Sequence, residues 1–248
     1  MNLIKPKFWN NNNLIVYLLW PLSIITRIVN LFKKIKIKNN TDIKTICVGN
    51  IYLGGTGKTQ LVIKLHNLLK KKGKITVIKK RYEDQIDEQK LLEKRTKLIL
   101  PKNRVEGLKK IQNTKNNIAI FDDGLQDKSL KYDISIVCFN SLSGIGNGKL
   151  LPAGPLREDL SELKNYDIVF INGKKNKNLL KIIKKHNKNL KVFTGKYILK
   201  NKNSFNRKKK YLAFCGIGTP ENFFALLHEN KINIKKKLIF PDHFDYKL

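Results

Sequence analysis

The stretch that most constrains the fold runs from Val48 to Gln60 and reads VGNIYLGGTGKTQ. The apolar run 45–48 that leads into it predicts a buried strand, and the leucine-rich segment 61–69 that leaves it predicts a helix. Between them, clustered glycines precede Gly57-Lys58-Thr59. This is the strand, loop and helix order of a phosphate-binding P-loop, so we expect a nucleotide site here.

The residue types of this loop suit phosphate binding. Glycines let the backbone wrap a phosphate and point its N–H groups inward, and the helix N-terminus adds positive potential. Lys58 is expected to reach the β- and γ-phosphates, and the Thr59 hydroxyl to hold Mg²⁺. The motif asks for glycine where Tyr52 stands, and a tight turn without a ligand is the alternative. The predicted ATP-binding residues are Tyr52, Leu53, Gly54, Gly55, Thr56, Gly57, Lys58 and Thr59.

Strand and helix patterns alternate after this loop. We expect strands at 75–78, 118–121, 134–139 and 168–171, and helices at 60–72, 87–98 and 104–113. Such alternation predicts an α/β fold with a mostly parallel sheet flanked by helices. Asp122 and Asp123 directly follow the strand 118–121. Carboxylates at the carboxyl end of a strand can hold Mg²⁺ beside a P-loop, and Asp-Gly turn chemistry is the alternative.

The charge of the chain bears on its partners. The formal net charge is +32, carried by 45 lysines and only six arginines, with 28 asparagines. Lys, Asn and Ile have A/T-rich codons, and the lysines are spread along the chain, so no nucleic-acid partner is predicted. A basic surface still favours anionic partners such as nucleotides, phospholipids or a phosphorylated substrate. Cys47, Cys138 and Cys215 lie in separate apolar runs and are expected to be buried reduced thiols of a cytosolic protein.

The N-terminal region contains an apolar segment, 14–25, followed by Lys33, Lys34, Lys36 and Lys38. Its clean apolar run is shorter than the ~20 residues that span a bilayer. No small-residue cleavage site follows, which argues against a secretory signal. Trp9 and Trp20 suit the headgroup level and the lysines suit anionic lipid. We expect a membrane-anchoring helix that is inserted or lies in the interface, and a helix packed on the protein's own core is the alternative.

The second half of the chain contains one long irregular segment and a second strand–turn–helix. Residues 144–158 are rich in Gly and Pro and predict an ordered functional loop. Within it, Arg157 and Glu158 either contact substrate or pair on the surface. The lysine-rich stretch 174–210 predicts a solvated face with a helix near 178–186. The strand 211–215 and the helix 221–229 enclose a glycine turn without a phosphate-binding lysine, so we predict no second nucleotide site.

Several motifs together resemble the tetraacyldisaccharide 4'-kinases, the lipid A 4'-kinases of Gram-negative bacteria. The resemblance runs along nearly the whole chain, and the P-loop is its least specific part. The motifs are Pro21-Leu22-Ser23, the P-loop stretch 48–59, Asp122-Asp123-Gly124-Leu125-Gln126, the run GNGKLLPAGPLRE at 146–158, Gly216-Ile217-Gly218 and Phe240-Pro241-Asp242-His243.

The resemblance implies an ATP- and Mg²⁺-dependent lipid kinase. Its acceptor would be the 4'-hydroxyl of an acylated glucosamine disaccharide 1-phosphate, which becomes lipid IVA in lipid A synthesis. The enzyme would contact membrane lipids at the cytoplasmic face of the bacterial inner membrane, and its oligomeric state is not predicted. We expect a membrane-anchoring helix in 1–38, a nucleotide-binding core in 39–155, and a smaller C-terminal α/β subdomain in 156–248 that is shorter than the family's.

The resemblance also implies residue roles. The pair Asp87-Glu88 would open a helix, and Asp87 would work with His243 to take the proton from the sugar hydroxyl. A carboxylate oriented by an imidazole is a competent general base at neutral pH. The residues alone leave other interpretations open, because Asp87 suits a helix cap and His243 a turn. Glu88, Gln126, Arg157 and Glu158 are predicted to contact substrate or support the site.

The chain departs from the family pattern at several positions. Asp127 stands where the family has His, Ile86 where it has Gly, and Lys79-Lys80-Arg81-Tyr82 where it has Ser-Arg-Gly-Tyr. The family also continues past the His motif, whereas this sequence stops at Leu248. Two alternatives therefore remain, a soluble P-loop GTPase or metal-insertion ATPase and a catalytically inactive membrane-binding homologue. The first would need a guanine-reading Asn-Lys-x-Asp, which the sequence lacks.

Overall fold

The computed structural model describes residues 5–32, 41–83, 85–114, 117–242, 244 and 246. Most of these residues surround a seven-stranded sheet in the order β3-β2-β4-β1-β5-β6-β7, in which every neighbouring pair is parallel. The predicted α/β fold with a parallel sheet is thus confirmed. The strands are β1 (Lys44–Gly49), β2 (Ile75–Lys79), β3 (Leu98–Ile99), β4 (Ile118–Asp122), β5 (Ile134–Asn140), β6 (Ile168–Asn172) and β7 (Lys191–Gly195).

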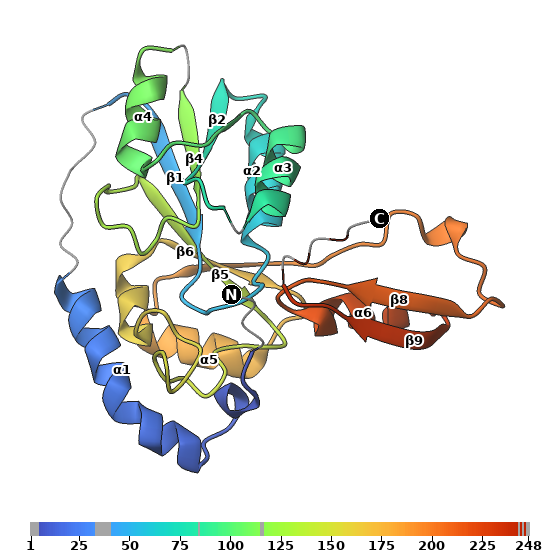
Figure 1. Cartoon of the computed structure of the whole chain (residues 1–248). Coiled ribbons are helices and arrows are strands. Elements are labelled where there is room, and N and C mark those ends of the chain that lie inside the picture. The colour runs from blue at the N-terminus through green and yellow to red at the C-terminus, as the bar shows by residue number, and fades with distance from the viewer. Residues whose placement is uncertain are drawn as a thin grey trace.

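Helices cover both faces of this sheet, which explains why its central strands are apolar on both sides. On one face, α2 (Lys58–Leu69) and α3 (Ile86–Arg95) pack Val62 and Leu92 against alternate strand residues. On the other, α4 (Arg104–Gln112) and α5 (Lys177–His186) pack Leu108 and Ile183. Figure 1 shows α2 and α3 together on one side of the strands and α4 on the opposite side. Cys47 and Cys138 are buried and unbonded in these two layers, as predicted.

The order of the strands fixes where a ligand can bind. The chain runs outward from β1 to β2 and β3, returns to β4 beside β1, and then crosses to β5 on the other side of β1. In open parallel sheets, ligands bind at the carboxyl ends of the strands where the order reverses. The P-loop follows β1 and the Asp122-Asp123 pair lies at the end of β4. The topology therefore brings both predicted features to one edge.

A separate small unit follows the sheet. Strands β8 (Tyr211–Cys215) and β9 (Ile234–Ile239) pair in parallel, and α6 (Pro220–Glu229) connects them. Phe224 and Leu227 of α6 pack with Ala213 and Cys215 of β8 in a small core. Figure 1 shows this unit projecting to one side of the large sheet. Because β6 and β7 belong to the large sheet, the sheet itself continues past residue 156, and the domain division proposed there stays a prediction.

The N-terminal segment forms η1 (Lys7–Asn10) and then α1 (Leu14–Phe32), a helix longer than the predicted apolar run. By length and composition α1 could cross a membrane, and only 11% of its most apolar window is buried inside the protein. One polar side chain per turn faces inward, because Ser23 Oγ and Thr26 Oγ1 donate to the Leu150 and Leu151 carbonyl oxygens at 2.9 and 2.8 Å. Farther along, Asn30 Nδ2 donates to the Arg157 carbonyl oxygen at 2.8 Å. This polar stripe docks α1 on the 144–158 loop, which is irregular as predicted.

Candidate active site

The P-loop is held in shape by asparagines. Asn50 Nδ2 donates to the Gly54 carbonyl oxygen at 3.2 Å and to Thr56 Oγ1 at 3.1 Å. Asn140 Nδ2, at the end of β5, donates to the Gly55 carbonyl oxygen at 3.3 Å. Gly57 has a φ of 84°, a left-handed conformation that favours glycine, and it precedes the first turn of α2. The loop thus places Lys58 and Thr59 at a helix N-terminus, as predicted.

Tyr52 explains why this P-loop lacks the first glycine of its motif. Its side chain is 2% exposed and packs with Leu150 and Leu156, and its backbone pairs with Leu156 in an isolated bridge. The loop therefore begins as an extended segment bound to the 144–158 loop rather than as a free glycine turn. The tyrosine at this position anchors the P-loop to its neighbour.

Two charged side chains, Asp123 and Arg157, lie beside Lys58. Its Nζ is 3.8 Å from Asp123 Oδ1, and Arg157 Nη1 is 3.0 Å from the same oxygen and 3.0 Å from Asn50 Oδ1. Asp123 has a φ of 54°, a left-handed backbone conformation that is uncommon for a residue other than glycine. Burial acts to raise the pKa of Asp123, but Lys58 and Arg157 outweigh burial and hold that pKa below its usual value. The structure thus brings Lys58, Asp123 and Arg157 together.

Asp122 occupies a different environment, fully buried at the end of β4. Lys79 Nζ is 3.0 Å from its Oδ2 and 2.7 Å from Glu88 Oε2. Burial acts to lower the pKa of Lys79, but these two carboxylates outweigh it and raise that pKa. The other oxygen, Asp122 Oδ1, is buried without a hydrogen-bond partner.

The donor set at this edge fits the predicted Mg²⁺. An unpartnered, buried carboxylate oxygen beside a P-loop is the hard ligand that Mg²⁺ prefers, and Mg²⁺ takes its other ligands mostly from phosphates and water. Among the described residues, no group of three His, Cys, Asp or Glu side chains gathers that could hold a metal ion by itself. Thr59, Asp122 and Asp123 remain the residues that would hold the ion.

Gln126 and Glu158 lie in a network behind the P-loop. Gln126 Nε2 donates to the Asn50 carbonyl oxygen at 3.0 Å and to Glu158 Oε2 at 2.9 Å. Tyr166 OH donates to the same Glu158 oxygen at 2.6 Å, and Lys128 lies 3.7 Å from the other. Glu158 is 1% exposed. These contacts fit a supporting role for Gln126 and Glu158, which stays a prediction.

Of the two residues predicted to form the general base, the structure describes Asp87 but not His243. Asp87 lies in the first turn of α3 and is exposed. The next residue, Glu88, binds Lys79, so the turn that contains Asp87 is connected to Asp122. His243 lies outside the described residues. The small unit does approach the P-loop, since Thr219 Oγ1 donates to the Gly55 carbonyl oxygen at 2.9 Å.

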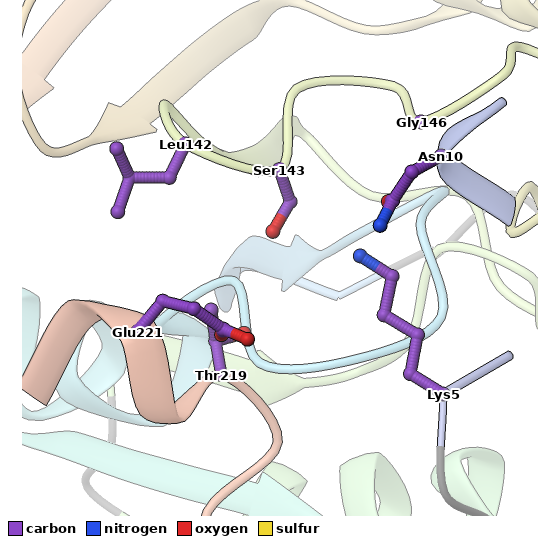
Figure 2. Close-up of a pocket in the computed structure, with 7 residues that line it drawn as sticks. All are labelled: Lys5, Asn10, Leu142, Ser143, Gly146, Thr219 and Glu221. Atoms are coloured by element: carbon purple, nitrogen blue, oxygen red, sulfur yellow. The ribbon is translucent and has the colours of Figure 1, made fainter. Parts of the chain in front are cut away.

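A cavity of about 310 Å³ borders this contact. Figure 2 shows Lys5 and Asn10 approaching it from the N-terminal segment, and Thr219 and Glu221 facing it from the start of α6. Its lining is mostly polar, with one positive and one negative side chain. The full lining consists of Lys5, Asn10, Leu142, Ser143, Gly146, Thr219 and Glu221.

Sequence reasoning missed three residues that organise the site. They are Lys79, Asn50 and Thr219, which bind Asp122, the P-loop backbone and Gly55. Lys79 is named above only as part of a departure from the family pattern, although a lysine at the end of an otherwise apolar strand is unusual and could have indicated a role. Thr219 had no such signal, since its partner lies 164 residues away in the chain.

A phosphate-binding loop, a lysine in the helix that follows it, and two aspartates at the end of the neighbouring strand, one of them fully buried, define a P-loop phosphotransferase. The sequence model of the tetraacyldisaccharide-1-P 4'-kinases (LpxK) matches residues 15–248. The chain belongs to this family and is a kinase.

Individual relatives agree with the family assignment. A tetraacyldisaccharide 4'-kinase of Pelagibacter ubique is 46% identical over 99% of this chain and 80% of its own length. The enzyme of the same name from Rickettsia akari is 35% identical over the same shares. The fold resembles LpxK from Aquifex aeolicus, solved in complex with ATP, with a TM-score of 0.69 and 23% identity over 94% of this chain and 84% of that one. Membership of this kinase family argues against the alternative of a soluble P-loop GTPase or metal-insertion ATPase.

Proposed function

We propose that this chain transfers the γ-phosphoryl group of ATP to the 4'-hydroxyl of tetraacyldisaccharide 1-phosphate, giving lipid IVA for lipid A synthesis. The observation that supports this most directly is the convergence of Lys58, Asp123 and Arg157 at the sheet edge where a P-loop binds its nucleotide. Family membership supplies the acceptor, as the names of the relatives state.

On the nucleotide side, the loop amides and Lys58 hold the β- and γ-phosphates. Arg157, 3.0 Å from Asp123, is placed to turn toward negative charge on the transferring group. Thr59, Asp122 and Asp123 would hold Mg²⁺, which would neutralise phosphate charge when bound. Catalysis in this arrangement is mostly positioning and charge neutralisation.

On the acceptor side, the Asp87 carboxylate takes the proton of the 4'-hydroxyl, and His243 orients that carboxylate. The sugar oxygen forms a bond to the γ-phosphorus while the bond from that phosphorus to the β,γ-bridging oxygen breaks. ADP leaves with the electron pair of the broken bond. The polar cavity beside Thr219 is our candidate for part of the sugar headgroup site, because it lies between the P-loop and the segment that precedes α1.

The membrane side of the enzyme is α1. Its exposed residues include twelve large hydrophobic side chains, and burying each contributes about 1.5–3 kcal/mol. Attraction of a lysine to anionic lipid contributes about 1 kcal/mol, so the apolar face dominates binding. Because the polar stripe contacts the protein, we expect α1 to lie in the interface at the cytoplasmic face of the inner membrane.

The test is transfer of label from γ-labelled ATP to tetraacyldisaccharide 1-phosphate in mixed micelles with Mg²⁺. We expect a bis-phosphorylated lipid, and Lys58→Ala should reduce its formation by at least about 100-fold without unfolding the protein. Lys64→Ala, on the same helix, is the matched control and should keep the wild-type rate. Binding of ATP without any labelled lipid would instead identify a catalytically inactive homologue.

A further inference from the structure

Lys79 is among the largest fully buried side chains of the described residues. It ends β2, directly across the sheet from Asp122 of β4, and its side chain is 1% exposed. A buried ammonium group is costly unless it is paired and hydrogen-bonded. Here it binds two carboxylates, Glu88 at 2.7 Å and Asp122 at 3.0 Å. The lysine therefore joins three elements, β2, β4 and α3.

The contact with Asp122 leaves one specific atom available. Lys79 occupies Oδ2, and Oδ1 is buried without a hydrogen-bond partner. If the Asp122 carboxylate served only to stabilise the core, both of its oxygens would be expected to have hydrogen-bond partners, as buried polar atoms usually do. Fixing one oxygen sets the rotation of the carboxylate, so the free oxygen keeps a defined direction.

The contact with Glu88 acts on the acceptor side. Glu88 follows Asp87 in the first turn of α3, and the N-cap residue Gln85 makes no side-chain capping hydrogen bond. The Lys79–Glu88 bond ties the start of the helix to β2, in addition to the hydrogen bonds that Gln89 Nε2 donates to the Tyr82 and Gln85 carbonyl oxygens. The Glu88 side chain is 30% exposed, whereas the Lys79 side chain is 1% exposed and lies in the core.

We infer that Lys79 is a positioning residue that holds Asp122 in the orientation for Mg²⁺ and, through Glu88, fixes the helix turn that contains Asp87. One buried cation thus sets the distance between the nucleotide side and the acceptor side of the reaction. The inference rests on the proposed kinase reaction for its acceptor half only. Its Mg²⁺ half concerns nucleotide binding and stands without the lipid.

The experiment compares Lys79→Met, which keeps the length but removes the charge, with Lys79→Arg and with Lys90→Met on the exposed face of α3. Two quantities are measured on the full chain. They are the Mg²⁺ concentration that gives half-maximal binding of a fluorescent ATP analogue, and kcat and KM for ATP in lipid phosphorylation.

For Lys79→Met we expect the Mg²⁺ midpoint to rise at least about fivefold and kcat to fall at least about 30-fold, as for a misplaced catalytic group. Lys79→Arg should recover part of both losses, because its fork can still bind two carboxylates. Lys90→Met should stay within about twofold of wild type. A merely structural role would lower the active fraction and leave the midpoint unchanged, and that result would overturn the inference.

Glu88→Ala keeps the inference testable if Lys79→Met fails to fold. It breaks only the contact with α3, so kcat should fall at least about tenfold while the Mg²⁺ midpoint moves less than about twofold. Full turnover in this variant would refute the acceptor half. If the wild-type chain makes no lipid product, the proposed function fails, and the Mg²⁺ midpoints still decide the role of Lys79 at Asp122.

Discussion

At the scale of single residues, the site separates two adjacent aspartates. Asp122 is buried against Lys79, and Asp123 faces Lys58 and Arg157. Adjacent side chains of a strand already point to opposite faces, and the left-handed backbone at Asp123, with a φ of 54°, marks the point where β4 has ended. Two neighbouring carboxylates can therefore do different work, one oriented from within the core and one placed at the phosphates.

Asp87 is the residue on which the proposed proton transfer depends. Asp87→Ala should lower kcat at least about 100-fold with KM for ATP nearly unchanged, because the nucleotide contacts lie on other elements. Steady-state kinetics with both substrates varied provide the measurement. Glu93→Ala, on the same helix and also exposed, is the control. A near wild-type rate for Asp87→Ala would mean that another group is the base.

The positions of candidate site residues could be predicted from sequence where the pattern is local, while their chemical roles stay predictions. Gly57-Lys58-Thr59 and Asp122-Asp123 follow apolar strands, and such positions are recognisable without tertiary information. Lys79 and Thr219 were missed, because their importance comes from partners 43 and 164 residues away. Tyr52 was predicted as part of the loop, but its packing against Leu156 depends on a tertiary contact that no local pattern encodes.

At the scale of elements, apolar patterns predicted the central strands well and the edge strands poorly. The predicted helix 87–98 ends at Arg95, and β3 begins at Leu98. The stretch that contains β7 was predicted as a solvated face, and β9 was not predicted. β7 reads KVFTG and lies in a lysine-rich stretch, and β9 reads IKKKLI with three consecutive lysines. Edge strands carry such charges because one side faces water, so their composition resembles that of a loop.

The helix α1 allows an element-scale prediction about membranes. Replacing Leu18 and Ile25 together by Glu should weaken binding to anionic lipid vesicles at least about tenfold, since both side chains are exposed and apolar. Turnover on a short-chain, water-soluble acceptor should persist, because the docking stripe is untouched. Vesicle co-sedimentation measures the first effect. Leu68→Glu, similarly exposed on α2, is the control, and equal loss in both proteins would contradict an α1 anchor.

At the scale of the whole molecule, the small unit of β8, α6 and β9 meets the P-loop through a narrow contact. Thr219 Oγ1 binds the Gly55 carbonyl oxygen, and a side chain at Gly218 would collide with the Gly55 backbone. The two parts of the chain thus touch at the loop that binds phosphate. We expect the nucleotide affinity to depend on this contact.

Thr219→Val tests this dependence with little change in shape. A neutral hydrogen bond contributes about 0.5–1.5 kcal/mol, so KM for ATP should rise by a factor between about 2 and 12. The melting temperature should change little, because the residue is not in either hydrophobic core. Thr96→Val, which removes another threonine-to-carbonyl bond away from the P-loop, is the control. An unchanged KM for ATP in Thr219→Val would show that the contact does not support the loop.

The polar stripe of α1 bears on the distance between the membrane and the reaction site. Ser23, Thr26 and Asn30 bind the backbone of the same loop that ends in Arg157. If the opposite, apolar face of α1 is inserted in a bilayer, these hydrogen bonds connect the membrane to the reaction site through ordered structure rather than through a flexible linker. We therefore expect α1 to hold the reaction site at a fixed height above the bilayer. Such an arrangement would favour acceptors whose hydroxyl stands at that height above the acyl chains, whatever the length of those chains.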